Sequence, residues 1–355
     1  MPGSKPQAAP IVAALPTYLV PPVLFTGLLV TLWVQKCILM ILFQNKIIYM
    51  PSLPPNSRYE TIADYARECR GVGWEEQSIR SLDGTQISLC VGRILEKDHV
   101  PDSAEPKKHI VIVYFQGNGS STPPRLPLLS RVLRTLHNDC NPSSCTYTII
   151  ALSYRGYWTS RGRPSQSGIE LDALATLSWV QQTYAPSLAG DMRIILWGQS
   201  IGAGVAATAL AKHFSALPPP SNLDDPQDQQ RLPIAALILE TPFLSIRKML
   251  AALYPEKWVP YQYLWPFLRN WWDSEAALRK LAAHGGVRRG VKVLMLEAEM
   301  DEVVPRDQGE ELWRVAGEAG LDVRRVVVGR ALHHEASTKG EGQRALVGLL
   351  KEVGR

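Results

Sequence analysis

A chain of 355 residues in which 46% of the side chains are hydrophobic can bury a substantial core, which excludes disorder as its overall state. The formal net charge of +5 is modest, and its Lys and Arg side chains accompany no recognition motif for DNA or RNA. Nucleic acid is therefore not expected as a partner.

The first predicted element is an apolar helix close to the N-terminus. No charged side chain lies between Lys5 and Lys36, and the apolar run continues to Phe43. A helix over residues 18–43 would be long enough to cross a bilayer, and a proline pair suits its first turn. A cleaved signal peptide would be shorter and would end in small residues, so a retained, single-pass anchor is preferred.

The charges on either side of this span differ only slightly, and they favour a cytosolic location for the rest of the chain by a small margin. Residues 1–17 are expected to form a tail that precedes the anchor. Residues 44–59 are rich in proline and are expected to form an extended linker. The folded domain should then cover residues 60–355.

This domain begins with a hairpin signal, because Asp83-Gly84 separates two strand-like runs at residues 75–80 and 85–93. Further strands are predicted at residues 109–115, 147–153, 193–197, 234–239, 291–296 and 323–328. Helices are predicted at residues 124–137, 168–183, 201–214, 305–316 and 340–353. Apolar strands interleaved with helices predict an α/β fold, with a mostly parallel sheet covered by helices on both faces.

Two segments interrupt the alternation of strands and helices. Residues 217–232 are polar and rich in proline, which predicts a flexible surface loop. Residues 244–285 are expected to form a cap or lid insertion, and within them residues 254–272 hold four Trp and three Tyr. These aromatic side chains either pack the cap onto the sheet or form a lid that contacts the bilayer.

The five cysteines show no C-x-x-C spacing and no neighbouring histidines, so no metal ion is expected. Cys140 and Cys145 flank a turn-like stretch and could form a disulfide in an oxidising compartment. Free thiols are preferred, because a chain of this length does not depend on disulfides for its stability.

The segment Gly198-Gln199-Ser200-Ile201-Gly202 is the only G-x-S-x-G in the chain. It follows a predicted strand and precedes a predicted helix, which is the context that this motif requires. A tight turn there would lift the hydroxyl group of Ser200 above the sheet, at a helix N-terminus that favours developing negative charge. Ser200 is therefore the candidate nucleophile, and an ordinary glycine-flanked turn is the alternative.

A serine nucleophile needs a base, which a carboxylate in turn orients. Asp301 follows the strand at residues 291–296 and His333 follows the last strand, so the candidates occur in the order Ser, Asp, His. Glu240, which also follows a strand, is a less favoured alternative to Asp301. His334 is an alternative to its neighbour His333, because adjacent residues in an extended loop point in opposite directions.

The loop after the strand at residues 109–115 is expected to stabilise an oxyanion. Main-chain N–H groups of Gly117 and Asn118 could do so together with that of Ile201. A flexible glycine turn is the alternative. Asn118 also begins an N-x-S sequon, and a sugar there would block the site, which disfavours a glycosylating lumen.

Together with further motifs, these residues make the chain resemble the bud-emergence (Bem) branch of membrane-anchored α/β-hydrolase-domain proteins. The motifs that carry the resemblance are residues 43–51, 116–119, 154–157, 162–172, 198–202, 239–243 and 301–305. The chain departs from the family pattern at Gln116, where the family has His, at Ala298, where it has Gly, and at His334, where it has Asn.

The resemblance implies the α/β-hydrolase fold, an intact Ser-Asp-His triad and an endomembrane location, with the endoplasmic reticulum favoured over the plasma membrane. It also implies an ester or thioester of a lipid or of a lipidated protein as substrate. The predicted reaction is hydrolysis through an acyl-Ser200 intermediate, without metal or organic cofactor. A catalytically silent membrane-anchored scaffold and a serine peptidase are the alternatives, and the sequence indicates no oligomeric state.

Overall fold

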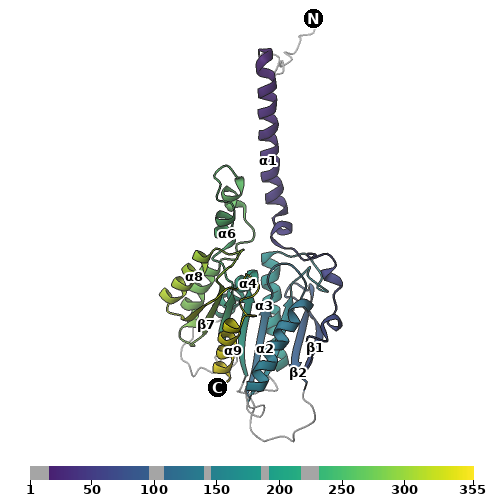
Figure 1. The fold of residues 1–355 in the computed structure, drawn as a ribbon, viewed down its shortest axis with the longest axis vertical. Coiled ribbons are helices and arrows are strands. Elements are labelled where there is room, and N and C mark those ends of the chain that lie inside the picture. Colours follow the sequence, from purple (N-terminus) through teal and green to yellow (C-terminus); the bar gives the residue numbers. More distant parts are fainter. Residues whose placement is uncertain (1–15, 96–107, 140–144, 185–191, 217–231) are drawn as a thin grey trace.

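A computed structural model describes residues 16–95, 108–139, 145–184, 192–216 and 232–355 of the chain (Figure 1). The strands are β1 (Val72–Arg80), β2 (Gln86–Ile94), β3 (Lys108–Phe115), β4 (Cys145–Ser153), β5 (Met192–Gln199), β6 (Ile234–Glu240), β7 (Lys292–Ala298) and β8 (Asp322–Val328). The helices are α1 (Val20–Ile48), α2 (Leu126–Asp139), α3 (Gln166–Tyr184), α4 (Ile201–Ser215), α6 (Ile246–Leu253), α7 (Ser274–Leu281), α8 (Arg306–Glu318) and α9 (Gly340–Gly354).

The strands form one sheet in the order β1-β2-β4-β3-β5-β6-β7-β8. The predicted hairpin is present, because β1 pairs antiparallel with β2, and β2 is also antiparallel to β4. Each remaining pair is parallel. The predicted α/β fold with a mostly parallel sheet is confirmed, and parallel strands place their carboxyl ends at one edge.

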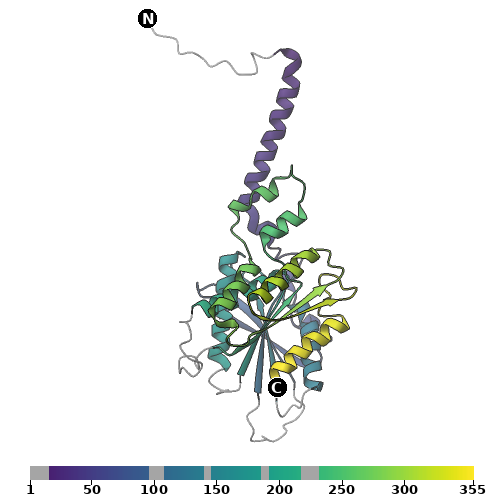
Figure 2. The same cartoon turned by 90° about the vertical axis from the view of Figure 1, so that its left-hand side faces the viewer.

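Helices cover both faces of this sheet (Figure 2). Side chains of α3, α4, α7 and α8 pack against one face of the sheet and form a core cluster that includes Val113, Leu196 and Leu237. Side chains of α2 and α9 pack on the opposite face around Ile112 and Trp197. Because both faces are buried, the central strands are apolar almost throughout, which explains why their sequence shows runs and not alternation.

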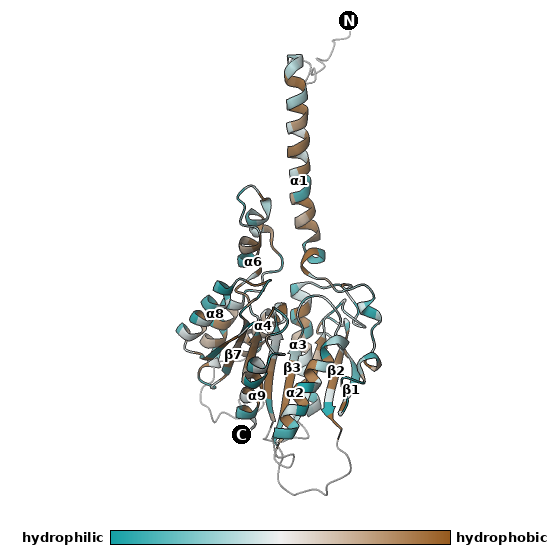
Figure 3. Ribbon diagram, viewed as in Figure 1, coloured by the Kyte–Doolittle hydropathy of each residue, from teal (hydrophilic) through white to brown (hydrophobic). Residues whose placement is uncertain are grey.

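Helix α1 extends away from the domain and exposes a long apolar surface (Figure 3). The helical stretch Thr17–Ile48 covers 32 residues and is long and apolar enough to cross a membrane. Its backbone departs from helical geometry at Phe43, yet the helix continues to Ile48. Helical backbone therefore continues to Ile48, past the predicted start of the linker at residue 44, and the departure from helical geometry at Phe43 coincides with the predicted end of the membrane-spanning segment.

The segment between β6 and β7 contains two short helices, α6 and α7, which the sequence pattern did not predict. Its aromatic side chains divide into two groups. Trp272 is completely buried in the core, whereas Trp258 and Tyr263 are 78% and 56% exposed. Trp272 therefore cannot belong to a lid surface. The exposed aromatics follow α6 in the sequence, and this segment rises beside α1 in Figure 2.

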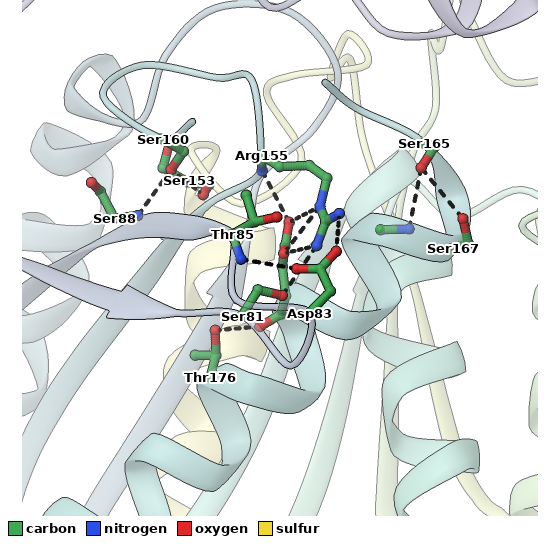
Figure 4. Close-up of polar contacts among 12 residues, drawn as sticks. Ser81, Asp83, Thr85, Ser88, Ser153, Arg155, Ser160, Ser165, Ser167 and Thr176 are labelled. Carbon is green, nitrogen blue, oxygen red and sulfur yellow. Dashed lines mark hydrogen bonds and ion pairs between the residues drawn. The ribbon is translucent and has the colours of Figure 1, made fainter. Parts of the chain in front are cut away.

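Arg155 anchors the motif at residues 154–157 to two other parts of the fold (Figure 4). Its guanidinium group donates to the buried carboxylate of Asp172 on α3 at 2.7 Å and to Asp83 in the β1–β2 turn at 2.7 Å. The hydrogen bond from Arg155 lowers the pKa of Asp83. Since Asp172 is fully buried, loss of Arg155 would leave an unpaired charge inside the protein, which costs about 3–5 kcal/mol.

Two predictions fall on residues outside those described. The proposed disulfide depends on Cys140, which is not among the described residues, and the predicted flexible loop falls almost entirely outside them.

Candidate active site

The nucleophile candidate lies in a sharp turn between β5 and α4. Ser200 has φ 53° and ψ −118°, a strained conformation for a residue with a side chain. A Cβ atom on Gly198 would lie 2.1 Å from the carbonyl oxygen of Gly202, and one on Gly202 would lie 2.1 Å from that of Phe115. Only glycine fits both positions, so the two glycines of the motif permit the close approach of β3, β5 and α4.

Ser200 is fixed from both sides of the turn. Its backbone amide donates to the carbonyl oxygen of Glu240 at 2.8 Å, and its own carbonyl accepts from Ala203 at 2.8 Å. The side chain remains partly exposed at the carboxyl edge of the sheet, directly before the N-terminus of α4. This arrangement presents a hydroxyl group where helix N–H groups can stabilise negative charge.

Asp301 and His333 come together at the same edge. Asp301 follows β7 and His333 follows β8, and Nδ1 of the histidine lies 2.9 and 2.8 Å from the two carboxylate oxygens. Both side chains are largely buried, with 13% of His333 and 9% of Asp301 exposed. Because Nδ1 pairs with the carboxylate, the other ring nitrogen, Nε2, is available to accept and to donate a proton.

Hydrogen bonds keep the Asp301 carboxylate ionised. Burial opposes ionisation, but the bond with His333 and those from the amides of Val304 and Val303 outweigh it and lower the pKa of Asp301. Both amides donate to Oδ1 at 2.8 Å. The carboxylate is thereby fixed in position before any substrate arrives.

Glu302 supports the same loop in a way that the sequence analysis did not predict. Its carboxylate accepts a hydrogen bond from the backbone amide of His333 at 2.9 Å, and this bond lowers the pKa of Glu302. The only sequence signal was a second acid directly after Asp301. Glu302 therefore holds the backbone of the histidine, while Asp301 holds its ring.

Glu240, the alternative acid, has different partners. It is fully buried, and its carboxylate accepts from Trp197 Nε1 at 3.0 Å and from the Ser337 amide and hydroxyl at 3.0 and 2.5 Å. Burial raises the pKa of Glu240. None of the described contacts joins it to either histidine. It connects β5, β6 and the loop after His333, which is a structural position beneath the site.

His334 is exposed, and no hydrogen bond joins its ring to Asp301 within the described residues. The structure thus brings together His333 and Asp301, and separates His334 and Glu240 from them. Among the described residues, no group of three or more His, Cys, Asp or Glu side chains could hold a metal ion.

The loop expected to stabilise an oxyanion, called the oxyanion loop below, follows β3 and lies beside Ser200. A Cβ atom on Gly117 would lie 3.7 Å from that of Ser200. Gln116 is fully buried, and its carbonyl oxygen accepts from Tyr154 at 2.8 Å while its side-chain oxygen accepts from Thr122 at 3.0 Å. Gln116 therefore still supports the loop where the resembled family has histidine. Within the described residues the amide of Asn118 has no protein acceptor, so it can donate to a ligand.

The Asn118 side chain joins this loop to the end of the anchor helix. Its Oδ1 accepts from the amide of Met50 at 3.1 Å and from the Tyr157 hydroxyl at 2.8 Å, and its Nδ2 donates to the carbonyl of Ile48. Asn118, whose backbone amide is expected to donate to an oxyanion, therefore also holds the segment after α1 through its side chain.

A second set of buried hydrogen bonds joins the anchor to the segment before α7. Asn270 accepts from the Tyr49 hydroxyl at 2.9 Å and donates to Asn45 at 2.6 Å, while Trp272 Nε1 donates to the Tyr49 oxygen at 2.9 Å. Gln44 donates to the carbonyl of Phe267 at 3.1 Å. The end of α1 is thus packed into the domain and is not a free linker.

Solved structures with a similar fold include an α/β hydrolase of Vibrio vulnificus. Its TM-score is 0.59, and it is 19% identical over 88% of this chain and 92% of that one. The chain has the α/β-hydrolase fold. An esterase of Pyrococcus furiosus matches at TM-score 0.52 and 17% identity, over 83% of this chain and 93% of the esterase. No protein-family model matches the chain.

Sequence relatives agree with the resemblance to the bud-emergence branch. Protein bem46 of Schizosaccharomyces pombe is 27% identical over 279 residues, which cover 78% of this chain and 76% of that protein. Lysophosphatidylserine lipase ABHD12 of Danio rerio is 32% identical over 216 residues, which cover 59% of this chain and 48% of the lipase. The chain therefore matches about half the length of this lipase.

Proposed function

We propose that the chain is a serine hydrolase that cleaves a carboxylic ester or thioester through an acyl-Ser200 intermediate. The observation that carries the proposal is the pairing of His333 Nδ1 with the Asp301 carboxylate, at the sheet edge where Ser200 stands on its strained turn. An acid, a base and a nucleophile at this edge constitute the machinery of acyl transfer.

In this reaction His333 Nε2 takes the proton of the Ser200 hydroxyl as its oxygen attacks the carbonyl carbon. The amides of Ile201 and of Asn118 or Gly117 donate to the resulting oxyanion. His333 then gives the proton to the leaving alcohol or thiol, and the acyl-serine forms. Water, deprotonated by the same imidazole, then attacks the acyl-serine, and the imidazolium returns the proton to the Ser200 oxygen as the acid is released. Asp301 stabilises the imidazolium in both steps.

The substrate that we propose is a lipid-type acyl ester, delivered at the membrane in which α1 is embedded. A lysophosphatidylserine lipase and esterases are among the similar proteins, and α1 brings the site close to a bilayer. An acyl thioester of a lipidated protein is the second member of the same class, because acyl transfer to serine is chemically the same for both. We propose the endoplasmic reticulum as the membrane.

A panel of substrates tests this proposal on the purified full-length chain in detergent micelles. The panel contains a short soluble ester, lysophosphatidylserine, lysophosphatidylcholine and a palmitoylated peptide thioester. We expect release of the acyl group from at least one long-chain substrate, and a loss of at least about 1,000-fold in Ser200→Ala. A Ser178→Ala variant changes an exposed serine on α3 and controls for the substitution itself. Turnover that persists in Ser200→Ala would overturn the mechanism, and a chain that cleaves nothing would favour the scaffold.

A further inference from the structure

A cavity of about 670 Å³ lies where the anchor meets the domain. The end of α1 forms one wall, the chain directly after α1 forms a second, and the loop between β4 and α3 forms a third. Residues from these walls include Phe43, Tyr49, Leu53 and Pro164. Because the cavity adjoins the last turns of a helix that can cross a membrane, it lies at the level of the lipid headgroups when α1 is embedded.

The charges that line this cavity are all positive. Lys46, Arg58 and Arg163 belong to its wall, and no Asp or Glu does. The Arg58 guanidinium is occupied by the carbonyl oxygens of Trp158 and Ser160.

Among the described residues, the other two cations have no carboxylate partner. Lys46 lies over the Phe43 ring at 5.3 Å, and Arg163 is exposed, with neither a hydrogen bond nor an ion pair in the described part of the chain. Two uncompensated cations therefore face a cavity large enough for a small organic ligand.

The cavity is separate from the candidate active site. None of Ser200, Asp301 and His333 lines it. It is nevertheless connected to the oxyanion loop, because Met50 forms part of its wall and donates its amide to Asn118. A ligand in the cavity would therefore contact the segment that holds that loop.

We propose that this cavity binds the phosphate-bearing headgroup of an anionic membrane phospholipid, with Arg163 and Lys46 as its cationic contacts. Guanidinium and ammonium groups are the side chains that recognise phosphate. Occupancy would immobilise the chain around Met50 and so stabilise the position of Asn118.

A soluble phosphate compound offers the same charge, but the walls favour a lipid. Leu42, Phe43, Met50 and Leu53 are each more than 40% exposed around the cavity, and such apolar surface suits the glycerol backbone and the first part of the acyl chains. The ligand is therefore the lipid itself and not free phosphate.

The test uses the full-length chain with Ser200→Ala, so that lipid retention is measured without hydrolysis and does not depend on the proposed function. The protein is reconstituted in phosphatidylcholine nanodiscs that contain a minor fraction of phosphatidylglycerol. Native mass spectrometry then counts the phosphatidylglycerol molecules that the released protein retains. Arg163→Gln and Lys46→Gln remove one cation each, and Arg344→Gln removes an exposed cation from α9, which contributes nothing to the cavity.

We expect retention of one phosphatidylglycerol, weakened about fivefold by each cavity substitution, because a basic side chain near an anionic headgroup contributes about 1 kcal/mol. Arg344→Gln should retain lipid as the parent does. If Arg163→Gln is folded, as judged by circular dichroism, and retains as much phosphatidylglycerol as the parent, the proposal is overturned. Displacement of the lipid by soluble glycerol 3-phosphate would overturn the choice of a lipid.

A second readout rests on the proposed function. In the chain with Ser200 intact, phosphatidylglycerol should raise kcat on a short soluble ester, and Arg163→Gln should reduce this response without changing the basal rate in phosphatidylcholine. If lipid is retained but the chain cleaves no ester, the cavity proposal stands and the enzymatic one fails. If kcat is insensitive to phosphatidylglycerol in an active enzyme, the link from the cavity to Asn118 is refuted.

Discussion

Asn270 is the buried amide on which the junction between the anchor and the domain depends. Its side-chain oxygen accepts from Tyr49 at 2.9 Å and from the amide of Gln166 at 2.8 Å. Its nitrogen donates to Asn45 at 2.6 Å and to Gln44 at 3.3 Å. Asn270→Ala would remove all four contacts at once and leave the buried Tyr49 hydroxyl and the partly buried Gln166 amide without this acceptor.

An unsatisfied buried polar group costs about 1–3 kcal/mol, so Asn270→Ala should destabilise the protein by about 2–4 kcal/mol. For a domain of this size that loss corresponds to a fall in apparent Tm of roughly 5–12 °C. The activity should fall as well, because Met50 follows directly after Tyr49 and holds Asn118. The assay is thermal unfolding in micelles, followed by tryptophan fluorescence, together with kcat on a short ester.

Gln262→Ala is the matched control, since this amide lies in the same segment and makes a single exposed hydrogen bond. Its Tm should stay within about 1 °C of the parent. If Asn270→Ala melts with the parent, the end of α1 is not integrated into the domain, and the reasoning from these hydrogen bonds is refuted.

Three further predictions test the site itself. Gly202→Ala should reduce kcat by roughly 100-fold or more, because the added Cβ would lie 2.1 Å from the carbonyl oxygen of Phe115. Gly348→Ala is the control, since its methyl group would extend into open space, and this variant should retain activity. Glu240→Gln should lower the free energy of unfolding by about 1–3 kcal/mol. The Glu240 carboxylate accepts three hydrogen bonds, and in glutamine an NH2 group, which is a donor, replaces one of the two accepting oxygens. Because burial raises the pKa of Glu240 in the folded state, its contribution to stability is fully present below the ordinary glutamate pKa and is lost as pH rises through the raised one, so the penalty measured by urea unfolding should shrink as the pH is raised above the ordinary value. His333→Ala should abolish ester turnover, while His334→Ala should keep most of it, and the reverse outcome would exchange their roles.

The sequence was most informative where structure depends on near neighbours. The elbow at Ser200 was predictable because two glycines, a strand and a helix stand within a short window. Asp301 and His333 were identified because each follows a strand of a parallel sheet, whose strand ends meet at one edge. Their pairing, however, could be stated only as a preference over Glu240 and His334, because the direction of a side chain in a loop depends on its tertiary contacts.

The junction was missed for a different reason. The polar residues Gln44 and Asn45 led to the prediction that the membrane-spanning helix ends at Phe43, whereas helical backbone continues to Ile48 beyond a departure from helical geometry at Phe43. Nothing in their local sequence indicates Asn270 as a partner, since more than 220 residues separate them. Contacts of this kind are set by the whole fold.

The two short helices had local signals that could have been used. Ser245 caps α6 by accepting from the amide of Lys248 at 3.2 Å, and Asp273 caps α7 by accepting from that of Ala276 at 2.8 Å. Serine and aspartate are preferred at such positions.

The central claim is that the Ser200 hydroxyl is an activated nucleophile. A fluorophosphonate probe forms a covalent bond with such a hydroxyl, and peptide mapping by mass spectrometry locates the modified residue. We predict a single adduct on Ser200 in the 355-residue protein, with no labelling of Ser200→Ala and undiminished labelling of Ser178→Ala. Labelling of another residue, or equal labelling of the parent and Ser200→Ala, would contradict it.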